Sequence, residues 1–251
     1  MTNIILCGCN GKMGKAITAC VDKTEDCRIV AGVDLNTESL NSYPVYDCFD
    51  KILESADVII DFSNPLVLDS LLDYAKEKKL PVVLATTGFS DAQTKKIYDT
   101  AKSIPLFFTF NMSLGINLLI SLSKKAASIL GDDFDIEIIE KHHNQKIDAP
   151  SGTAIMLANA INDTLDNKYL YEYDRHSKRE KRKKNEIGIH SIRGGTVVGE
   201  HDVIFAGHDE VITLSHHAAS KEVFAIGAVK AAMFMKDKPS GIYDMNNVIS
   251  H

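Results

Sequence analysis

The chain contains no tryptophan, few prolines and no long apolar run. Its longest apolar stretches, such as Ile116–Leu122, are far shorter than a membrane span and carry Asn and Ser. The N-terminus lacks the basic start and the long apolar segment that mark a secretory signal. These absences argue against a membrane or secreted protein, and we expect a soluble protein of the cytoplasm.

Acidic residues outnumber basic ones, with 34 Asp and Glu against 28 Lys and Arg. The formal net charge of −6 argues against general binding to nucleic acids or to anionic membranes. The composition, 45% hydrophobic and 25% charged, is ordinary for a soluble chain with one large or two modest domains. One dense basic run, Lys178–Lys184, stands out. Its pattern predicts a solvated loop, and a lip that attracts phosphate is the alternative.

Cysteine is confined to the first fifth of the chain, and its number is odd. The five residues are Cys7, Cys9, Cys20, Cys27 and Cys48. A disulfide framework would be spread over the fold and even in number. Cys7 and Cys9 have no second Cys or His pair at zinc-site spacing. We therefore expect reduced, buried thiols and no metal.

The first hundred residues alternate between short apolar runs and helical patterns. The predicted strands are Asn3–Cys7, Arg28–Asp34, Val58–Phe62, Val82–Thr86 and Leu106–Phe110. The predicted helices between them are Lys12–Val21, Pro65–Lys79 and Asp91–Lys102. Continuous apolar strands separated by helices indicate a parallel sheet that is covered on both faces. The pattern is typical of a Rossmann-type, doubly wound α/β fold.

The pattern changes after Met112 and predicts a second, α+β domain. Helices are expected at Leu114–Leu130, Thr153–Leu165 and Glu222–Met235, and a strand at Phe134–Glu140. Three further strands, Ile187–Arg193, Thr196–Phe205 and Val211–His216, are joined by turns that contain glycine and predict an antiparallel meander. We place the first domain at residues 1–112 plus about 222–251, and the second at 113–221.

A glycine-rich turn follows the first strand and opens the first helix. The segment Gly8-Cys9-Asn10-Gly11-Lys12-Met13-Gly14 has the spacing G-x-x-G-x-x-G. Glycines at such a turn let the backbone approach a pyrophosphate, which then lies at the helix N-terminus. An ordinary strand-to-helix turn would show glycine as well. The strand before it, the helix after it and the acidic residue twenty positions later together favour a dinucleotide site.

That acidic residue is Asp34, at the end of the second predicted strand. A carboxylate there can accept hydrogen bonds from the ribose hydroxyls of an adenosine. Leu35, not an arginine, follows it, so a 2′-phosphate would meet a carboxylate without an adjacent guanidinium. This favours NADH over NADPH, although the ammonium of Lys12 could reach a phosphate.

Two further turns fall where a doubly wound sheet places its ligand loops. They contain Ala85, Thr86 and Thr87, and Thr109, Phe110, Asn111 and Met112. Their backbone and hydroxyl groups could bind the nicotinamide ribose or amide. Phe62 and Ser63 end a third strand, and there a plain helix cap is an equal alternative.

The segment from Glu140 to Thr153 carries the clearest chemistry. His142 and His143 are adjacent, and Lys146 follows three residues later, between a predicted strand and a predicted helix. Ser151 is a plausible N-cap, so Gly152 and Thr153 would present backbone N–H groups to an anion. The segment can therefore bind a carboxylate beside titratable groups. No third ligand lies at metal-site spacing, so a metal is not expected.

Several segments together resemble the 4-hydroxy-tetrahydrodipicolinate reductase family, also called dihydrodipicolinate reductase. They are GCNGKMG, ATTGF, NMSLGIN, HHNQKIDAPSGTA and IHSIRGGTVVGEH, in the family's order and across essentially the whole chain. The resemblance implies reduction of a cyclic dicarboxylate with NADH or NADPH and loss of water, in lysine and diaminopimelate synthesis. It also implies a homotetramer joined through the sheet of the second domain.

The resemblance also assigns roles to residues. It implies that His142 is a proton donor and acceptor, that Lys146 is a proton donor, and that His143, Gly152 and Thr153 bind substrate. It implies that Gly8–Met13, Asp34, Ala85–Thr87 and Thr109–Met112 bind the cofactor. This chain departs from the family at Ala85, where Gly is frequent, and at Leu35, where some members have Arg. The residues alone leave open whether Lys146 donates a proton or only binds substrate.

Two other functions compete with this one. Another two-domain dehydrogenase, of the sugar or aspartate type, would share the glycine turn but not the His-His-x-x-Lys…Ser-Gly-Thr segment. A non-catalytic protein that senses a dinucleotide would need no such cluster. Oxidation of NADH in the presence of the cyclic substrate separates the three.

Overall fold

The computed structural model describes residues 1–250 and divides into two compact units. The N-terminal unit comprises Met1–Leu114 together with the described residues from Glu222 onward, and the C-terminal unit comprises Gly115–Lys221. The C-terminal unit is therefore an insertion in the sequence of the first.

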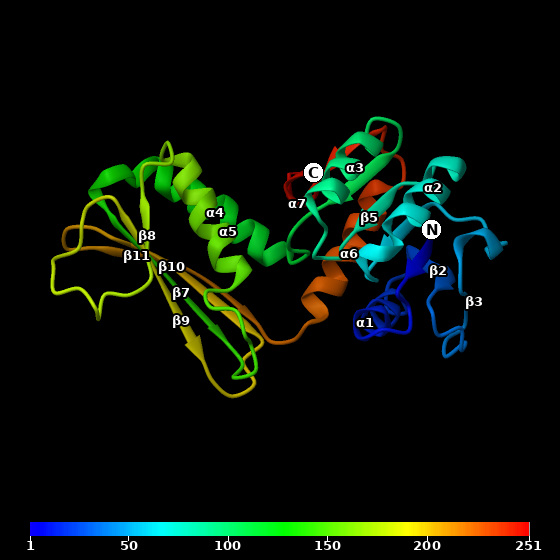
Figure 1. Cartoon of the computed structure of the whole chain (residues 1–251), viewed down its shortest axis with the longest axis horizontal. Helices are drawn as coiled ribbons and strands as arrows, with labels where there is room; N and C mark the ends of the chain where they lie inside the picture. The colour runs from blue at the N-terminus through cyan, green and yellow to red at the C-terminus, as the bar shows by residue number, and fades with distance from the viewer. Residues whose placement is uncertain (251) are drawn as a thin grey trace. The chain divides into compact units, whose positions relative to one another are not determined.

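The N-terminal unit is built on a parallel sheet of seven strands in the order β12-β6-β5-β4-β1-β2-β3. Figure 1 labels β2, β3 and β5 of this sheet. Its strands are β1 (Thr2–Cys7), β2 (Cys27–Val33), β3 (Val45–Tyr46), β4 (Val58–Asp61), β5 (Val82–Leu84), β6 (Pro105–Phe108) and β12 (Gly241–Tyr243). Its helices are α1 (Lys12–Val21), α2 (Leu68–Lys78), α3 (Asp91–Thr100), α6 (Glu222–Met235) and α7 (Met245–Ile249), with short 3-10 turns η1 (Phe49–Lys51) and η2 (Pro65–Val67).

Both faces of this sheet are buried, which explains why its strands are continuously apolar. On one face Ile4 and Leu6 pack against α1 and α6, and on the other Ile5 packs with α2 and α3. The predicted Rossmann-type parallel sheet is thereby confirmed. The strand order reverses between β1 and β4, so the carboxyl ends of these two strands form the switch point where ligands bind in such sheets.

The C-terminal unit has a mixed sheet of five strands in the order β11-β10-β7-β9-β8. The strands are β7 (Asp135–His142), β8 (Leu170–Glu172), β9 (Glu186–Arg193), β10 (Gly199–Ala206) and β11 (Val211–Ala218). The helices are α4 (Leu114–Leu130) and α5 (Gly152–Thr164), and the 3-10 turn η3 (Gly131–Asp133) follows α4. The helices α4 and α5 lie over one face of this sheet (Figure 1). Leu119 of α4 and Leu157 of α5 pack there with Ile138 and Phe205.

The predicted antiparallel meander is only partly correct. β10 and β11 form the expected antiparallel pair, but β9 does not pair with β10. Instead β7 lies between them, parallel to β9 and antiparallel to β10. Backbone bonds from Gly194 N–H to His142 O and from Asn144 N–H to Gly195 O attach the β9–β10 connection to the end of β7. The glycine turn therefore passes over that strand end and does not close a hairpin.

One described segment, Leu114–Asp133, is long and apolar enough to cross a membrane by length and composition alone, with a mean hydropathy of 1.2. This is weak support for a membrane span, because a core helix of a soluble protein passes the same test. Here Leu119 and Ala127 of α4 belong to the core of the C-terminal unit.

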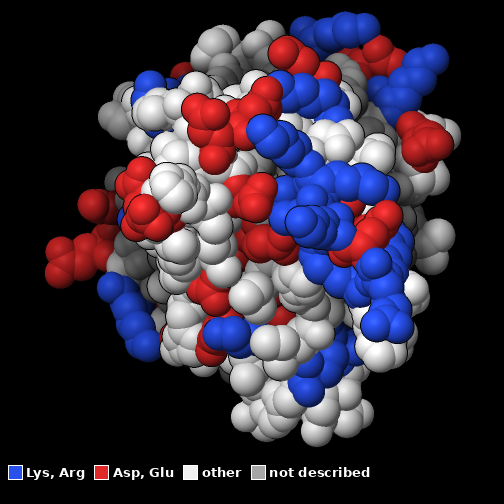
Figure 2. All heavy atoms as spheres, turned by 90° about the vertical axis from the view of Figure 1, so that its left-hand side faces the viewer, with Lys and Arg blue, Asp and Glu red and all other residues white. Residues whose placement is uncertain are grey.

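The basic run Lys178–Lys184 has neither helix nor strand, as predicted, but it is not wholly solvated. Arg182 donates hydrogen bonds to Glu137 and Asp135 of β7, at 3.0 and 2.7 Å, and Lys178 pairs with Glu172. These contacts attach the loop to the sheet. Figure 2 shows one side of the molecule, on which Lys and Arg side chains gather in one area beside Asp and Glu.

Candidate functional site

The glycine turn after β1 depends on the absence of side chains. Gly8 has φ +80°, and a Cβ there would lie 2.4 Å from the carbonyl oxygen of Phe62. A Cβ on Gly14 would lie 2.3 Å from the oxygen of Gly8, because α1 starts directly against the turn. Gly11 is the N-cap of α1 and offers no capping side chain. The first N–H groups of α1 thus face a turn whose backbone a phosphate can approach.

Asp34 lies one residue beyond β2 and is held by the glycine turn. Its Oδ2 accepts a hydrogen bond from Asn10 N–H at 2.9 Å, and its Oδ1 accepts one from Asn36 N–H at 3.1 Å. The side-chain amide of Asn10 also donates, through Nδ2, to the carbonyl oxygen of Asn36 at 2.6 Å. The carboxylate is thus fixed in direction, while its remaining lone pairs can accept from a diol.

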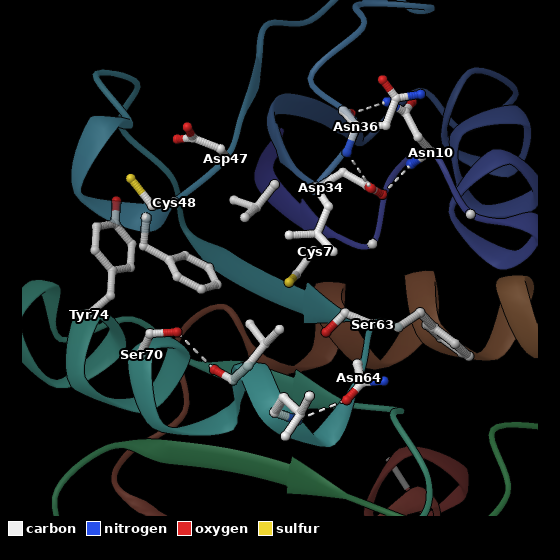
Figure 3. Close-up of a pocket in the computed structure, with 18 of the residues that line it drawn as sticks. Cys7, Asn10, Asp34, Asn36, Asp47, Cys48, Ser63, Asn64, Ser70 and Tyr74 are labelled. Carbon is white, nitrogen blue, oxygen red and sulfur yellow. Dashed lines mark hydrogen bonds between the residues drawn. The ribbon is translucent and has the colours of Figure 1, made fainter.

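A cavity of about 790 Å³ opens beside Asp34, within the N-terminal unit. Figure 3 shows Asp34, Asn10 and Asn36 on one side of it, and Cys48 and Tyr74 across from them. Phe49 and Tyr74 stack with their centroids 5.5 Å apart and form an apolar part of the wall. Its volume is in the range of small-molecule and cofactor sites.

The cavity wall is acidic. Five carboxylates line it: Asp34, Asp47, Asp50, Asp73 and Glu77. None of its lining residues is Lys or Arg, and Lys12 is exposed and not among them. Leu35, which does line it, is 97% exposed. The ammonium of Lys12, which the sequence offers as a phosphate partner, is therefore not part of this wall.

Sequence reasoning placed fourteen cofactor residues, and the structure brings four of them to the cavity: Gly8, Asn10, Gly11 and Asp34. Cys9 is buried in the core beneath the turn, and Met13 packs against that core.

The other predicted cofactor residues follow β5 and β6, whose carboxyl ends lie at the same edge of the parallel sheet. Thr86 is buried and its Oγ1 accepts from Ser63 N–H at 2.8 Å, while Ser63 Oγ donates to buried Asp61 at 2.5 Å. Burial raises the pKa of Asp61, and hydrogen bonds from Ser63 and Thr86 oppose that rise. Thr86 therefore links the carboxyl end of β5 to that of β4. Ala85, Asn111 and Met112 are also buried, whereas Thr87 and Phe110 are exposed and Thr109 is half-buried.

A second cluster lies in the C-terminal unit, at the end of β7. Because side chains alternate along a strand, Glu140 and His142 lie on the same face of β7 as Ile138, the face that packs against α4 and α5. Glu140 is fully buried, and its Oε2 is 2.6 Å from His142 Nδ1. On β9 Arg193 donates to both carboxylate oxygens, at 2.8 and 2.6 Å. Burial alone would raise the pKa of Glu140, but the bonds from Arg193, His142, Ser191 and Ser151 outweigh it and lower the pKa to about 2.

The N-terminus of α5 lies beside this cluster. The Ser151 side chain accepts from Ala154 N–H at 3.2 Å, which makes it the N-cap that the sequence predicts. Gly152 is exposed and Thr153 half-buried in the first turn. The helix has no acidic residue in its first turn, so its dipole favours an incoming carboxylate.

The remaining predicted residues lie in the loop between β7 and α5. Lys146 Nζ is 2.8 Å from Asp148 Oδ1, and His143 directly follows the last residue of β7 and is half-buried. The structure therefore brings His142, Lys146, His143, Gly152 and Thr153 into one strand-to-helix connection. Among the described residues no group of three His, Cys, Asp or Glu side chains could hold a metal ion.

Sequence reasoning assigned no role to Glu140, Arg193 or His201. His201 of β10 is 3% exposed, its ring lies edge-on to His142 at 5.3 Å, and its Nε2 is 3.2 Å from Ser151 Oγ. Burial, and then the nearby His142, lower the pKa of His201 to about 4. One signal was available for Glu140, because it continues the alternation of Ile136 and Ile138 and so predicts a charge on the core face.

A parallel sheet with a glycine-turn cavity, joined to a unit with an acid–base cluster beside a helix N-terminus, defines a two-domain oxidoreductase that uses a nicotinamide dinucleotide. Known proteins make the assignment specific. Residues 2–112 match the family model described as "Dihydrodipicolinate reductase, N-terminus", and residues 115–249 match "Dihydrodipicolinate reductase, C-terminus". The chain belongs to the dihydrodipicolinate reductase family, as its motifs indicate.

Individual relatives agree with this assignment. Proteins named 4-hydroxy-tetrahydrodipicolinate reductase from Caldanaerobacter subterraneus and Clostridium tetani are 53% and 54% identical to it over 99% and 100% of this chain, and 98% of each relative. A dipicolinate-bound dihydrodipicolinate reductase from Paenisporosarcina sp. TG-14 has a TM-score of 0.84 at 25% identity, covering 98% of this chain and 99% of that one. A myo-inositol dehydrogenase from Corynebacterium glutamicum, with a TM-score of 0.57 at 16% identity, shares the fold alone.

Proposed function

We propose that this enzyme reduces 4-hydroxy-tetrahydrodipicolinate to tetrahydrodipicolinate, with loss of water, in lysine and diaminopimelate synthesis. The observation that carries the proposal is the cluster at the end of β7. There, His142 is paired with Glu140 and lies close to the N-terminus of α5. A basic group that can exchange a proton and a helix start that favours a carboxylate are what a cyclic dicarboxylate substrate requires.

The N-terminal unit supplies the binding site for the reductant. A bound nicotinamide dinucleotide would provide the hydride equivalent, with its pyrophosphate at the turn of Gly8 and Gly11 and its adenosine ribose on Asp34. The chain's own task is to hold the substrate carboxylates and to supply a proton to the reduced ring system. In this proposal Gly152 and Thr153 bind a carboxylate, and Lys146 exchanges Asp148 for the substrate.

We further propose that NADH is preferred to NADPH. The support is the carboxylate wall, together with the absence of Lys and Arg from the cavity lining. A 2′-phosphate beside Asp34 would be repelled by about 1 kcal/mol at a wet site, which corresponds to about a fivefold ratio of Kd values. Leu35→Arg, at an exposed position beside Asp34, should shift the preference toward NADPH. Calorimetric titration of both cofactors tests this, and tighter NADPH binding by the unmodified protein contradicts it.

The test of the reaction is consumption of NADH in the presence of freshly generated substrate. We expect turnover that requires the cyclic dicarboxylate and that pyridine-2,6-dicarboxylate inhibits. Turnover with a sugar or with aspartate instead would indicate another dehydrogenase. Dinucleotide binding without turnover of any of these would indicate a sensor.

A homotetramer in the cytoplasm completes the proposal. Three apolar side chains on the sheet face opposite α4 and α5, Leu170, Ile192 and Val211, are 64%, 49% and 63% exposed, which suits a surface that subunits cover. All five cysteines are free, as expected in a reducing compartment. Light scattering after size-exclusion chromatography should give four times the chain mass, and a monomer would refute this assembly.

A further inference from the structure

Glu140 connects the two parts of the proposed substrate site. Its Oε2 lies 2.6 Å from His142 Nδ1, and its Oε1 accepts from Ser151 N–H at 3.1 Å. The first contact reaches the imidazole, and the second reaches the residue that caps α5. One fully buried side chain therefore contacts both the proton-transfer group and the helix start that favours a carboxylate.

Arg193 holds this carboxylate in its charged form and in one orientation. Its two terminal nitrogens donate to the two oxygens of Glu140, a bidentate geometry that fixes the plane of the carboxylate. The same guanidinium donates to the carbonyl of Asp148 at 2.7 Å, within the loop that leads to α5. The bonds to Glu140 therefore keep an anion buried that would otherwise be protonated.

The direction of the Glu140–His142 contact selects one tautomer of the imidazole. An ionised carboxylate only accepts hydrogen bonds, so the nitrogen beside it, Nδ1, carries the hydrogen. The other nitrogen, Nε2, lies beside Gly199, where an added Cβ would come within 3.1 Å of it. The lack of a side chain at Gly199 therefore leaves space at Nε2.

We propose that Glu140 is a positioning residue that makes Nε2 of His142 the nitrogen that exchanges a proton with the substrate, and that aligns this nitrogen with the start of α5. The inference rests on the proposed reductase function and names the partner that His142 needs. The proton moves from Nε2 to the substrate, and the imidazole that remains is neutral, with its hydrogen on Nδ1 still bonded to Glu140. Glu140 itself gains and loses no proton.

The first test uses the unmodified protein and no substrate. Nitrogen-15 NMR of the neutral imidazole, assigned by its loss in His142→Gln, should show a hydrogen on Nδ1. A neutral ring with its hydrogen on Nε2 overturns the proposal. Because this measurement involves no turnover, it stands or falls independently of the proposed reaction.

The second test is a double-mutant cycle with Glu140→Gln and His142→Gln. Glu140→Gln should lower kcat at least about tenfold in the parent, by analogy with the acid that orients a catalytic histidine. In the His142→Gln background the same change should lower kcat less than about threefold, because the partner it positions is gone. A loss of equal size in both backgrounds would show that Glu140 only maintains the structure, and would overturn the proposal.

Glu137→Gln is the matched control. Glu137 is on the same strand and is also ion-paired, to Arg182 and Arg175, but it faces the opposite side of the sheet. The Glu137→Gln variant should keep the parental kcat and the Nδ1–H tautomer of His142. A tenfold loss of kcat in this variant would show that loss of any carboxylate on β7 lowers kcat. If Glu140→Gln does not fold, Glu140→Asp replaces it in the cycle and keeps the carboxylate one methylene short of His142.

Discussion

Because His201 is buried, the C-terminal unit should lose stability as the pH falls from 7 to 5. The imidazole is 3% exposed, and its Nε2 faces Ser151 Oγ at 3.2 Å. Its Nδ1 is buried without a hydrogen-bond partner among the described residues. Burial, reinforced by His142, lowers the pKa of His201 from 6.5 to about 4, so the folded protein favours the neutral ring.

The sign and size follow from proton linkage. Because the folded pKa lies below the unfolded one, the unfolded chain binds more protons below pH 6.5, and acid favours unfolding. The stability is fully present above pH 6.5 and is lost as the pH falls to about 4. Between the two pKa values, each pH unit is worth about 1.4 kcal/mol of stability. The loss from pH 7 to pH 5 is therefore about 2 kcal/mol. Glu140, with a pKa of about 2 against an ordinary 4.5, adds its own loss only below pH 4.5.

The assay is urea unfolding at pH 7 and pH 5, followed by far-UV circular dichroism because the chain has no tryptophan. His201→Gln keeps a side chain of similar size that can bond Ser151, and should reduce the loss by about 2 kcal/mol. His216→Gln is the matched comparison, since burial, and then the nearby His217, also lower the pKa of His216. If His201→Gln and the parent lose the same stability over this range, the reasoning is refuted.

Three further predictions concern the two sites. Thr153→Val should weaken competition by pyridine-2,6-dicarboxylate about fivefold, since a donor worth about 1 kcal/mol is lost at the helix start; an unchanged inhibition constant contradicts this. His142→Gln and Lys146→Met should each lower kcat by roughly 10²–10³ and leave the NADH Kd unchanged, and only Lys146→Met should raise the substrate KM. A kcat for His142→Gln within about twofold of the parent would exclude proton transfer by His142. Gly14→Ala should weaken NADH binding more than about tenfold, measured by calorimetry, because its Cβ would lie 2.3 Å from Gly8 O; parental affinity would show that the turn adapts.

The regular elements could be predicted because their signals are local. The helices Lys12–Val21, Leu114–Leu130 and Glu222–Met235 have the predicted ends, since apolar periodicity and terminal glycine or polar residues coincide there. β3 and β8, of two and three residues, were missed because they are too short to show a period.

The position of β9 in the sheet depends on contacts that are distant in sequence. Gly194 and Gly195 look locally like a hairpin turn, and the hydrogen bonds that contradict it come from His142 and Asn144, about fifty residues earlier. The cavity wall poses the same difficulty. Asp34 was found by its distance from the glycine turn, but Asp47 and Tyr74 reach the cavity from separate segments with no shared motif.

The burial of Glu140 argues for a role in the site more than for a role in stability. Moving a carboxylate out of water costs several kcal/mol, and a well-packed apolar residue of similar volume often serves the fold as well or better. Ile136 and Ile138 show that this face of β7 accepts apolar side chains. The oxygens of Glu140 are instead directed at His142 and Ser151, and Arg193 compensates the charge. Glu140 is therefore a buried charge that the core does not need, and it is bonded to groups that the proposed reaction uses. These are the features expected of a positioning carboxylate.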